Sequence, residues 1–206
     1  MTWTSAFGRT CGWLLDRIVN GLALTRISPN VLTFIGLVIN IVAAFFFGHA
    51  SSVNAGRFFF YGGLVIIGAG IFDMVDGRVA RRTNQVTIFG AFFDSVIDRY
   101  SDVVLFFGVL VYYARVNHFR YVVLTAFVMV TSLMVSYTRA RAEALIGQCK
   151  VGFMERPERI VLVILGALFN VMAPVLWVLA VLSTITVVHR IQYTYWNTKH
   201  LAPTAQ

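Results

Sequence analysis

The sequence predicts an all-α integral membrane bundle of six transmembrane helices, preceded by an N-terminal amphipathic helix at the membrane interface. The 206-residue chain is 58% apolar and only 13% charged, whereas an average soluble chain is about 25% charged. Its mean hydropathy is +0.76, and its apolar residues fall in repeated runs that approach the roughly 20 residues of a spanning helix. A membrane barrel would need short alternating strands instead. We therefore expect a single helical membrane domain over residues 1–206.

The elements follow in order along the chain. Residues 1–28 are expected to form the interfacial helix, because apolar residues such as Trp13 and Ile18 recur at helical spacing among polar ones. Ser28-Pro29-Asn30 then breaks the chain and caps the first span. A six-span bundle should occupy residues 29–196, followed by a tail over residues 197–206. The spans are expected at Val31–Phe47, Phe58–Val75 with its helix continuing to Ala80, Ile88–Tyr113, Tyr121–Thr138, Ile160–Phe169 and Pro174–Ile191.

Basic residues sort to one side of the predicted bundle. The formal net charge is +8, and most Lys and Arg residues lie in the N-terminal segment, after the second and fourth spans, and at the C-terminal end. By the positive-inside rule, both termini and these connections are expected on the cytoplasmic side. The expected location is a bacterial inner membrane. No basic run with interleaved aromatic residues marks a soluble module, so nucleic acid is not an expected partner.

Four of the nine acidic residues lie in one stretch at the predicted cytoplasmic ends of the second and third spans. Asp73 and Asp76 are three residues apart and Asp94 and Asp98 four apart, so each pair shares one helix face. The short link between the spans makes the helices antiparallel neighbours, which lets the two pairs face each other. Four close carboxylates at the edge of hydrocarbon cannot all stay ionised without cations. Because oxygen ligands suit Mg²⁺, Mn²⁺ or Ca²⁺, the stretch predicts a metal site.

Small residues and an arginine beside these carboxylates indicate that a diphosphate binds there. Gly77, Ala80 and Gly90 leave room for a ligand to approach, and Arg81 could bind a phosphate group. The bland alternative is a set of buried ion pairs between the carboxylates and Arg81, Arg82 and Arg99. A rival functional class is a cation-binding transporter, but the cluster lies near one interface, whereas transporter sites favour the bilayer midplane.

The complete pattern, Asp73-x2-Asp76-Gly77-x2-Ala80-Arg81-x8-Gly90-x3-Asp94-x3-Asp98, resembles the signature of the CDP-alcohol phosphotransferase (phosphatidyltransferase) family. The six-span layout, the interfacial helix and the Ser-Pro-Asn start of the first span are also similar to that family. The resemblance implies an enzyme of phospholipid synthesis that transfers a phosphatidyl group from a CDP-linked lipid, usually CDP-diacylglycerol, to an alcohol and releases CMP. It also implies a homodimer.

The resemblance further implies a role for each residue of the pattern. Asp73, Asp76, Asp94 and Asp98 would hold Mg²⁺ or Mn²⁺. Asp98 would also take the proton from the acceptor hydroxyl, as the catalytic base. The residues that would bind the CDP-lipid are Pro29, Asn30, Thr33, Asp73, Gly77, Ala80 and Arg81.

A second, basic cluster bears on the identity of the acceptor. Its arginines, Arg139, Arg156, Arg159 and Arg190, can converge on one cytoplasmic pocket and suit a phosphorylated acceptor better than a neutral one. Ser136 and three of these arginines resemble, by position, the family branch that makes phosphatidylinositol phosphate from inositol 1-phosphate, with Arg139 in place of the familiar lysine. Inositol 1-phosphate is therefore the expected acceptor. Glycerol 3-phosphate would need a similar pocket and stays open as an alternative, as does another alcohol.

Two smaller expectations concern residues around these clusters. Asp102 continues the stripe of Asp94 and Asp98 by one turn but falls outside the signature, so an ion pair with Arg99, three residues away, is expected. The glycines of the second span are expected to allow close helix packing rather than nucleotide binding, since no strand precedes them. They are Gly62, Gly63, Gly68 and Gly70.

Overall fold

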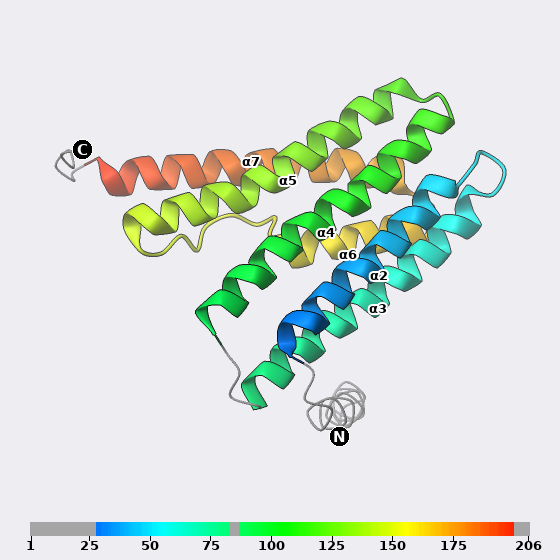
Figure 1. The fold of residues 1–206 in the computed structure, drawn as a ribbon. Coiled ribbons are helices and arrows are strands. Elements are labelled where there is room, and N and C mark those ends of the chain that lie inside the picture. Colours follow the sequence, from blue (N-terminus) through cyan, green and yellow to red (C-terminus); the bar gives the residue numbers. More distant parts are fainter. Residues whose placement is uncertain (1–27, 83–86, 200–206) are drawn as a thin grey trace, which may run out of the picture.

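The computed structural model describes residues 28–82 and 87–199, without the side chains of residues 74–82. Six helices and no strand form in these residues (Figure 1). The expected interfacial helix over residues 1–28 falls almost wholly outside them, as does most of the expected tail. The helices are α2 (Pro29–His49), α3 (Ala55–Arg82), α4 (Ile88–Arg115), α5 (Phe119–Ile146), α6 (Arg156–Leu168) and α7 (Met172–Thr198).

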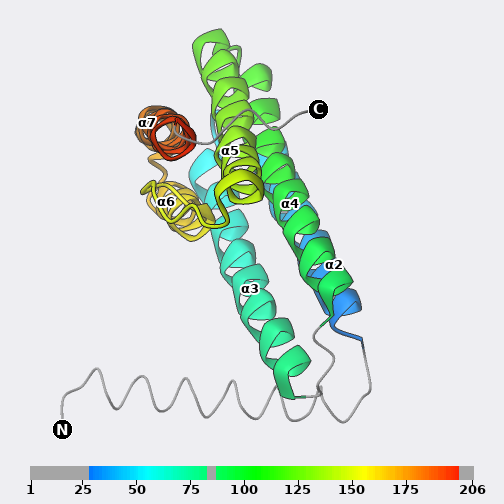
Figure 2. The same cartoon turned by 90° about the vertical axis from the view of Figure 1, so that its left-hand side faces the viewer.

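Consecutive helices run in opposite directions, but in the described residues α3 and α4 make no close backbone contact with each other, contrary to expectation, and both pack on α2 instead. Helix α2 lies along both α3 and α4, α5 packs against α4 and α7, and α6 contacts α3 and α7 (Figures 1 and 2). Fully buried side chains such as Phe47, Leu105 and Leu176 form the shared core. Because the chain reverses from one helix to the next, the start of α2, the end of α3, the start of α4, the α5–α6 link and the end of α7 lie toward one end of the bundle (Figure 1). The acidic and basic clusters of the sequence are both carried to that end.

Four of the six helices are long and apolar enough to cross a membrane, counting only the described residues: α2, the Ala55–Asp73 part of α3, α5 and α7. Helix α4 has the length but carries four charged residues between Asp94 and Asp102. Helix α6 has 13 residues, about 20 Å of helix at 1.5 Å per residue, against a hydrocarbon core of roughly 30 Å. The helical membrane fold is confirmed, whereas six complete crossings stay a prediction.

Two helix starts show how the local sequence sets the bounds. Helix α2 begins at Pro29, as expected, because proline suits the first helical turn, but the Ser28 side chain makes no capping hydrogen bond. Ser28 is still the N-cap residue, as expected, and its backbone carbonyl accepts a hydrogen bond from the Val31 N–H at 3.0 Å. A side-chain cap is found at α4 instead, where the Thr87 hydroxyl accepts a hydrogen bond from the Gly90 N–H at 2.9 Å. This cap fixes the first turn of the helix that carries Asp94 and Asp98.

Glycines allow close helix contacts at some of the expected places and not at others. A Cβ on Gly62 would collide with the ring of Phe47, and one on Gly63 would lie 3.1 Å from Ala167 Cβ. Gly68 and Gly70 face open space, so the packing explanation is wrong for them. Gly70 instead lines a groove described below.

Candidate active site

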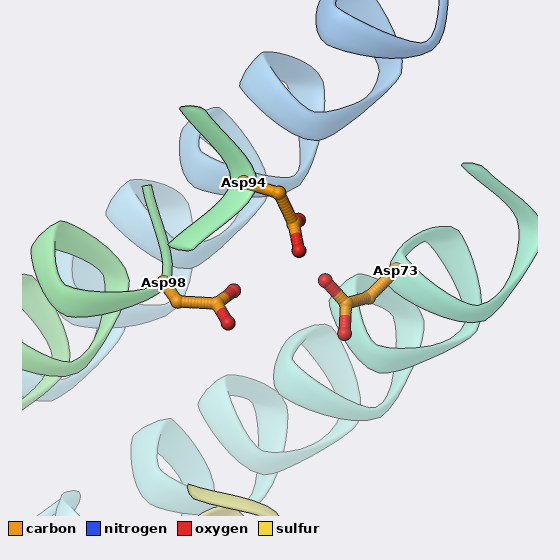
Figure 3. Close-up of side chains that lie close together, drawn as sticks. All are labelled: Asp73, Asp94 and Asp98. Carbon is orange, nitrogen blue, oxygen red and sulfur yellow. The ribbon is translucent and has the colours of Figure 1, made fainter. Parts of the chain in front are cut away.

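Three of the four signature aspartates meet between α3 and α4. Asp73 projects from α3, and Asp94 and Asp98 project from successive turns of α4, with all three carboxylates pointing into the same gap (Figure 3). Each offers one oxygen, and these three oxygens lie within 4.8 Å of one another. The spacings along the two helices produce this meeting, as the sequence predicted. The side chain of Asp76 is outside the described residues, although its position on α3 is described.

The donor set of this cluster fits a hard divalent cation. All three groups are carboxylates, which Mg²⁺ and Mn²⁺ prefer to nitrogen or sulfur ligands. The Asp73 side chain is 41% exposed and that of Asp98 is 18% exposed, so the cluster is partly withdrawn from water but reachable by a ligand. Three carboxylates this close repel one another unless cations neutralise them.

A cation of the protein itself already lies against this cluster. Nη1 of Arg156, at the start of α6, is 2.9 Å from Asp98 Oδ1 and 3.1 Å from Asp73 Oδ2. Its Nε lies 3.9 Å from Oδ1 of Asp102. The sequence placed Arg156 with the acceptor arginines. The structure shows that its guanidinium contacts the carboxylate cluster directly.

A groove of about 430 Å³ opens beside the carboxylates. It lies among α2, α3, α4 and α6, and most of its lining residues are apolar, such as Leu37, Ile66 and Ile164. Asp73, Asp98 and Arg156 line it together with Thr33, whose hydroxyl donates to the Pro29 carbonyl at 3.1 Å. Such a groove, charged where it meets the carboxylates and apolar beyond them, suits an amphiphile with a polar headgroup and acyl chains.

The other residues expected at the CDP-lipid end are only partly described. Asn30 lies at the start of α2 near the first turn of α4, because its side-chain oxygen would be 3.4 Å from a Cβ on Gly90. Pro29 precedes it as the first residue of α2. The remaining three, Gly77, Ala80 and Arg81, lie on the last turns of α3, and of their side chains nothing is described.

A second cavity, of about 250 Å³, adjoins the cluster on the side of α5 and α7. It is lined by all five residues expected around the acceptor: Ser136, Arg139, Arg156, Arg159 and Arg190. Asp98 and Arg156 line both this cavity and the groove. The two spaces therefore meet at the residue expected to act as base.

The arginines of the second cavity are held by acidic partners and carbonyl groups. Arg159 is buried, and its Nη2 is 2.5 Å from Oδ2 of the equally buried Asp102. The expected Arg99–Asp102 pair is therefore wrong, and Arg99 donates to the backbone carbonyl and hydroxyl of Ser95 instead. Burying a charge without a partner is costly, so the Asp102 carboxylate is what allows Arg159 to lie inside the bundle.

Arg190 of α7 is held by the segment that connects α5 to α6 and by a backbone carbonyl of α5. Its Nε donates to the Val151 carbonyl at 2.9 Å and its Nη1 to the Val135 carbonyl at 2.6 Å. The segment is residues 147–155, between α5 and α6, and we call it the α5–α6 strap. Within it, Gly152 has φ +104°, a backbone conformation open mainly to glycine.

Glu155, the last residue of the strap, is a site residue that sequence reasoning did not single out. Its Oε1 accepts from Arg139 Nη1 at 2.9 Å and from Arg190 Nη2 at 3.0 Å. Arg139 also pairs with Glu143, one turn further along α5, at 3.0 Å. An acidic residue directly before Arg156 was the available signal, but helical spacing says nothing about contacts with α5 and α7.

The comparisons with known proteins agree with this geometry. The family model described as CDP-alcohol phosphatidyltransferase matches residues 26–191, which include both clusters. This chain is a member of that family. It is therefore a transferase and an integral membrane protein, and the rival interpretation as a transporter falls away.

Two relatives of this family member have names that specify the lipid product. The chain is 38% identical over 179 residues to the archaetidylinositol phosphate synthase of Pyrococcus horikoshii, which covers 86% of this chain and 88% of the relative. It is 36% identical over 189 residues to the phosphatidylinositol phosphate synthase of Mycobacteroides abscessus, covering 86% and 81% of the two chains.

Solved structures of the Mycobacterium tuberculosis phosphatidylinositol phosphate synthase share the fold. The crystal structure with CDP-DAG bound superposes with a TM-score of 0.79 at 32% identity, covering 93% of this chain and 98% of that one. The crystal structure in complex with manganese and citrate gives 0.80 at 32% identity, covering 93% of each chain. The described helices thus belong to a fold in which a relative binds both a CDP-lipid and a divalent metal.

Proposed function

We propose that this family member transfers the phosphatidyl group of CDP-diacylglycerol to inositol 1-phosphate, releasing CMP, as a step of phospholipid synthesis. The observation that carries the acceptor is the convergence of Ser136, Arg139, Arg159 and Arg190 on one cavity beside the carboxylate cluster. Guanidinium groups gathered around one space suit a phosphate ester rather than a neutral alcohol. The names of the two relatives support the same acceptor.

In the chemical step, Asp98 accepts the proton of the acceptor hydroxyl. The acceptor hydroxyl attacks the phosphorus that bears the diacylglycerol, the bond from that phosphorus to the oxygen of CMP breaks, and CMP leaves. Asp98 borders both spaces, so its carboxylate can reach a hydroxyl that enters from the acceptor cavity and attacks a phosphorus held at the groove. A positioned carboxylate base of this kind contributes roughly 10²–10⁴ to the rate.

The cofactor is Mg²⁺ or Mn²⁺, and Asp73, Asp76, Asp94 and Asp98 would hold it. When bound, the metal supplies positive charge that stabilises the diphosphate and the departing CMP. The fit of the site rests on three carboxylate oxygens within 4.8 Å of one another and on the absence of nitrogen or sulfur from that set. Two roles then fall to Asp98, as ligand and as base.

The donor would lie with its diphosphate at the carboxylates and its chains in the groove among α2, α3, α4 and α6. Pro29, Asn30 and Thr33 at the start of α2 would then lie near the cytidine end. Gly77, Ala80 and Arg81 would accommodate the diphosphate from the last turns of α3. Arg156 borders both spaces, so its guanidinium is placed to contact the phosphate of either substrate.

The active-site end of the bundle would face the cytoplasm. Most Lys and Arg residues lie in segments at this end of the bundle, as the positive-inside rule requires of a cytoplasmic face. A water-soluble acceptor such as inositol 1-phosphate would enter from that side. We further propose an inner-membrane location in a bacterium and a homodimer, the latter on family resemblance.

The test is CMP release by the purified protein with CDP-diacylglycerol and Mg²⁺, compared across inositol 1-phosphate, glycerol 3-phosphate, free inositol and serine. Release that depends on inositol 1-phosphate is expected, whereas release only with another acceptor would overturn the acceptor assignment. R159A and R190A should abolish it. R141A is the matched control, because Arg141 is exposed and does not line the cavity. A donor with ether-linked chains, run in parallel, tests the lipid backbone.

A further inference from the structure

Every arginine expected to bind the acceptor phosphate is already paired with a carboxylate of the protein. Arg159 pairs with Asp102, and Arg156 pairs with Asp73 and Asp98. The remaining two, Arg139 and Arg190, share Glu155. An acceptor phosphate therefore has to compete with a carboxylate for its guanidinium partners.

Glu155 is the carboxylate that would compete with an acceptor phosphate for two arginines at once. Nη1 of Arg139 and Nη2 of Arg190, from two different helices, converge on the same oxygen, Glu155 Oε1, at 2.9 and 3.0 Å. Two guanidinium N–H groups directed at one anionic oxygen form the arrangement that binds a phosphate oxygen. The Glu155 carboxylate thus lies at the wall of the acceptor cavity, at a point where a phosphate oxygen could accept the same two hydrogen bonds.

Within the group of Arg139, Arg190 and Glu155, the Glu155 side chain is the one that can leave. The Arg190 side chain is 1% exposed, whereas that of Glu155 is 38% exposed. Two backbone carbonyls fix Arg190, and Glu143 supports Arg139 from the side. Glu155 lies at the N-terminal boundary of α6, where its side chain can rotate toward water while both arginines stay in place.

We propose that the Glu155 carboxylate occupies the acceptor-phosphate position and that only an anionic acceptor displaces it. This inference rests on the proposed function and adds a source of selectivity. A phosphate ester replaces both ionic hydrogen bonds that Glu155 gives up. An uncharged alcohol replaces neither, so it leaves the buried Arg190 without an anion and Arg139 with Glu143 alone.

The first test compares E155Q with the wild type in the CMP-release assay. The glutamine keeps the size of the side chain but loses its charge, so it competes more weakly for Arg139 and Arg190. We expect the KM for inositol 1-phosphate, and the inhibition constant of inorganic phosphate, to fall about three- to tenfold. E143Q is the matched control, because Glu143 pairs with Arg139 but does not line the cavity. It should shift both constants less than twofold.

Unchanged or increased constants in E155Q would overturn the proposal, since Glu155 would then merely support the arginines or bind the acceptor itself. E155D is a second variant, in which a shorter carboxylate should give an intermediate decrease. Thermal stabilisation by inorganic phosphate needs no turnover and should be larger in E155Q than in the wild type. If the wild type releases no CMP with inositol 1-phosphate, the acceptor assignment fails, and the phosphate measurement still decides the role of Glu155.

Discussion

At the scale of single residues, Asp98 is the group on which the chemical step depends. D98N keeps the shape of the side chain but cannot accept the proton of the acceptor hydroxyl. We expect kcat for CMP release to fall by about 10²-fold or more, while binding of CDP-diacylglycerol is retained. Y100F is the control, because Tyr100 lies on the same helix with its side chain exposed. A D98N rate within tenfold of the wild type would show that another group takes the proton.

The same scale shows what residue spacing can and cannot predict. Asp94 and Asp98 share a face because they lie one turn apart on α4, and their spacing in the sequence is enough to predict this. The Asp102–Arg159 pair joins residues 57 positions apart, so it depends on how α4 and α6 pack. Spacing alone predicted Arg99 as the partner of Asp102, but in the structure Asp102 pairs with Arg159 of α6.

At the scale of elements, hydropathy located every described helix but missed the polar ends of α5 and α7. Helix α5 was expected to end at Thr138 and continues to Ile146, and α7 was expected to end at Ile191 and continues to Thr198. Hydropathy detects the part that lies in hydrocarbon, whereas a helix continues into polar residues until a residue such as Gly147, with φ +78°, ends it. Arg139 lies on such a polar extension.

The α5–α6 strap is the element that fixes Arg190, and Gly152 is its tightest point. A Cβ added there would lie 2.6 Å from Thr186 Cγ2 and 3.1 Å from Arg190 Nε. We expect G152A to lower the free energy of unfolding by about 1–3 kcal/mol, from backbone strain and this contact, and to raise the KM for the acceptor about tenfold.

G147A is the matched control for that variant. Gly147 also has a positive φ, but a Cβ there meets nothing within 4 Å. It should lower the melting temperature without changing the acceptor KM. Equal effects of the two variants on KM would mean that strap stability, rather than the position of Arg190, governs acceptor binding.

At the scale of the whole molecule, the fold brings two chemically different spaces to one carboxylate cluster. The groove lies among α2, α3, α4 and α6, and the acceptor cavity is lined from α4, α5, α6 and α7. Helices α4 and α6 belong to both, and they are the two that length and charge exclude from the clear membrane spans. The charged residues of α4 are thus explained by the site that this helix helps to build.

The metal should stabilise the entire bundle, because its ligands come from α3 and α4 and repel each other without it. A ligand that binds only the folded state at 100 times its Kd adds about 2.7 kcal/mol. We therefore expect Mg²⁺ or Mn²⁺ to raise the melting temperature of the purified protein by several degrees over the same protein in EDTA. D94N removes one ligand together with part of the repulsion, so its melting temperature should respond much less to Mg²⁺. An equal response in both proteins would place the stabilising ion outside the three-carboxylate cluster.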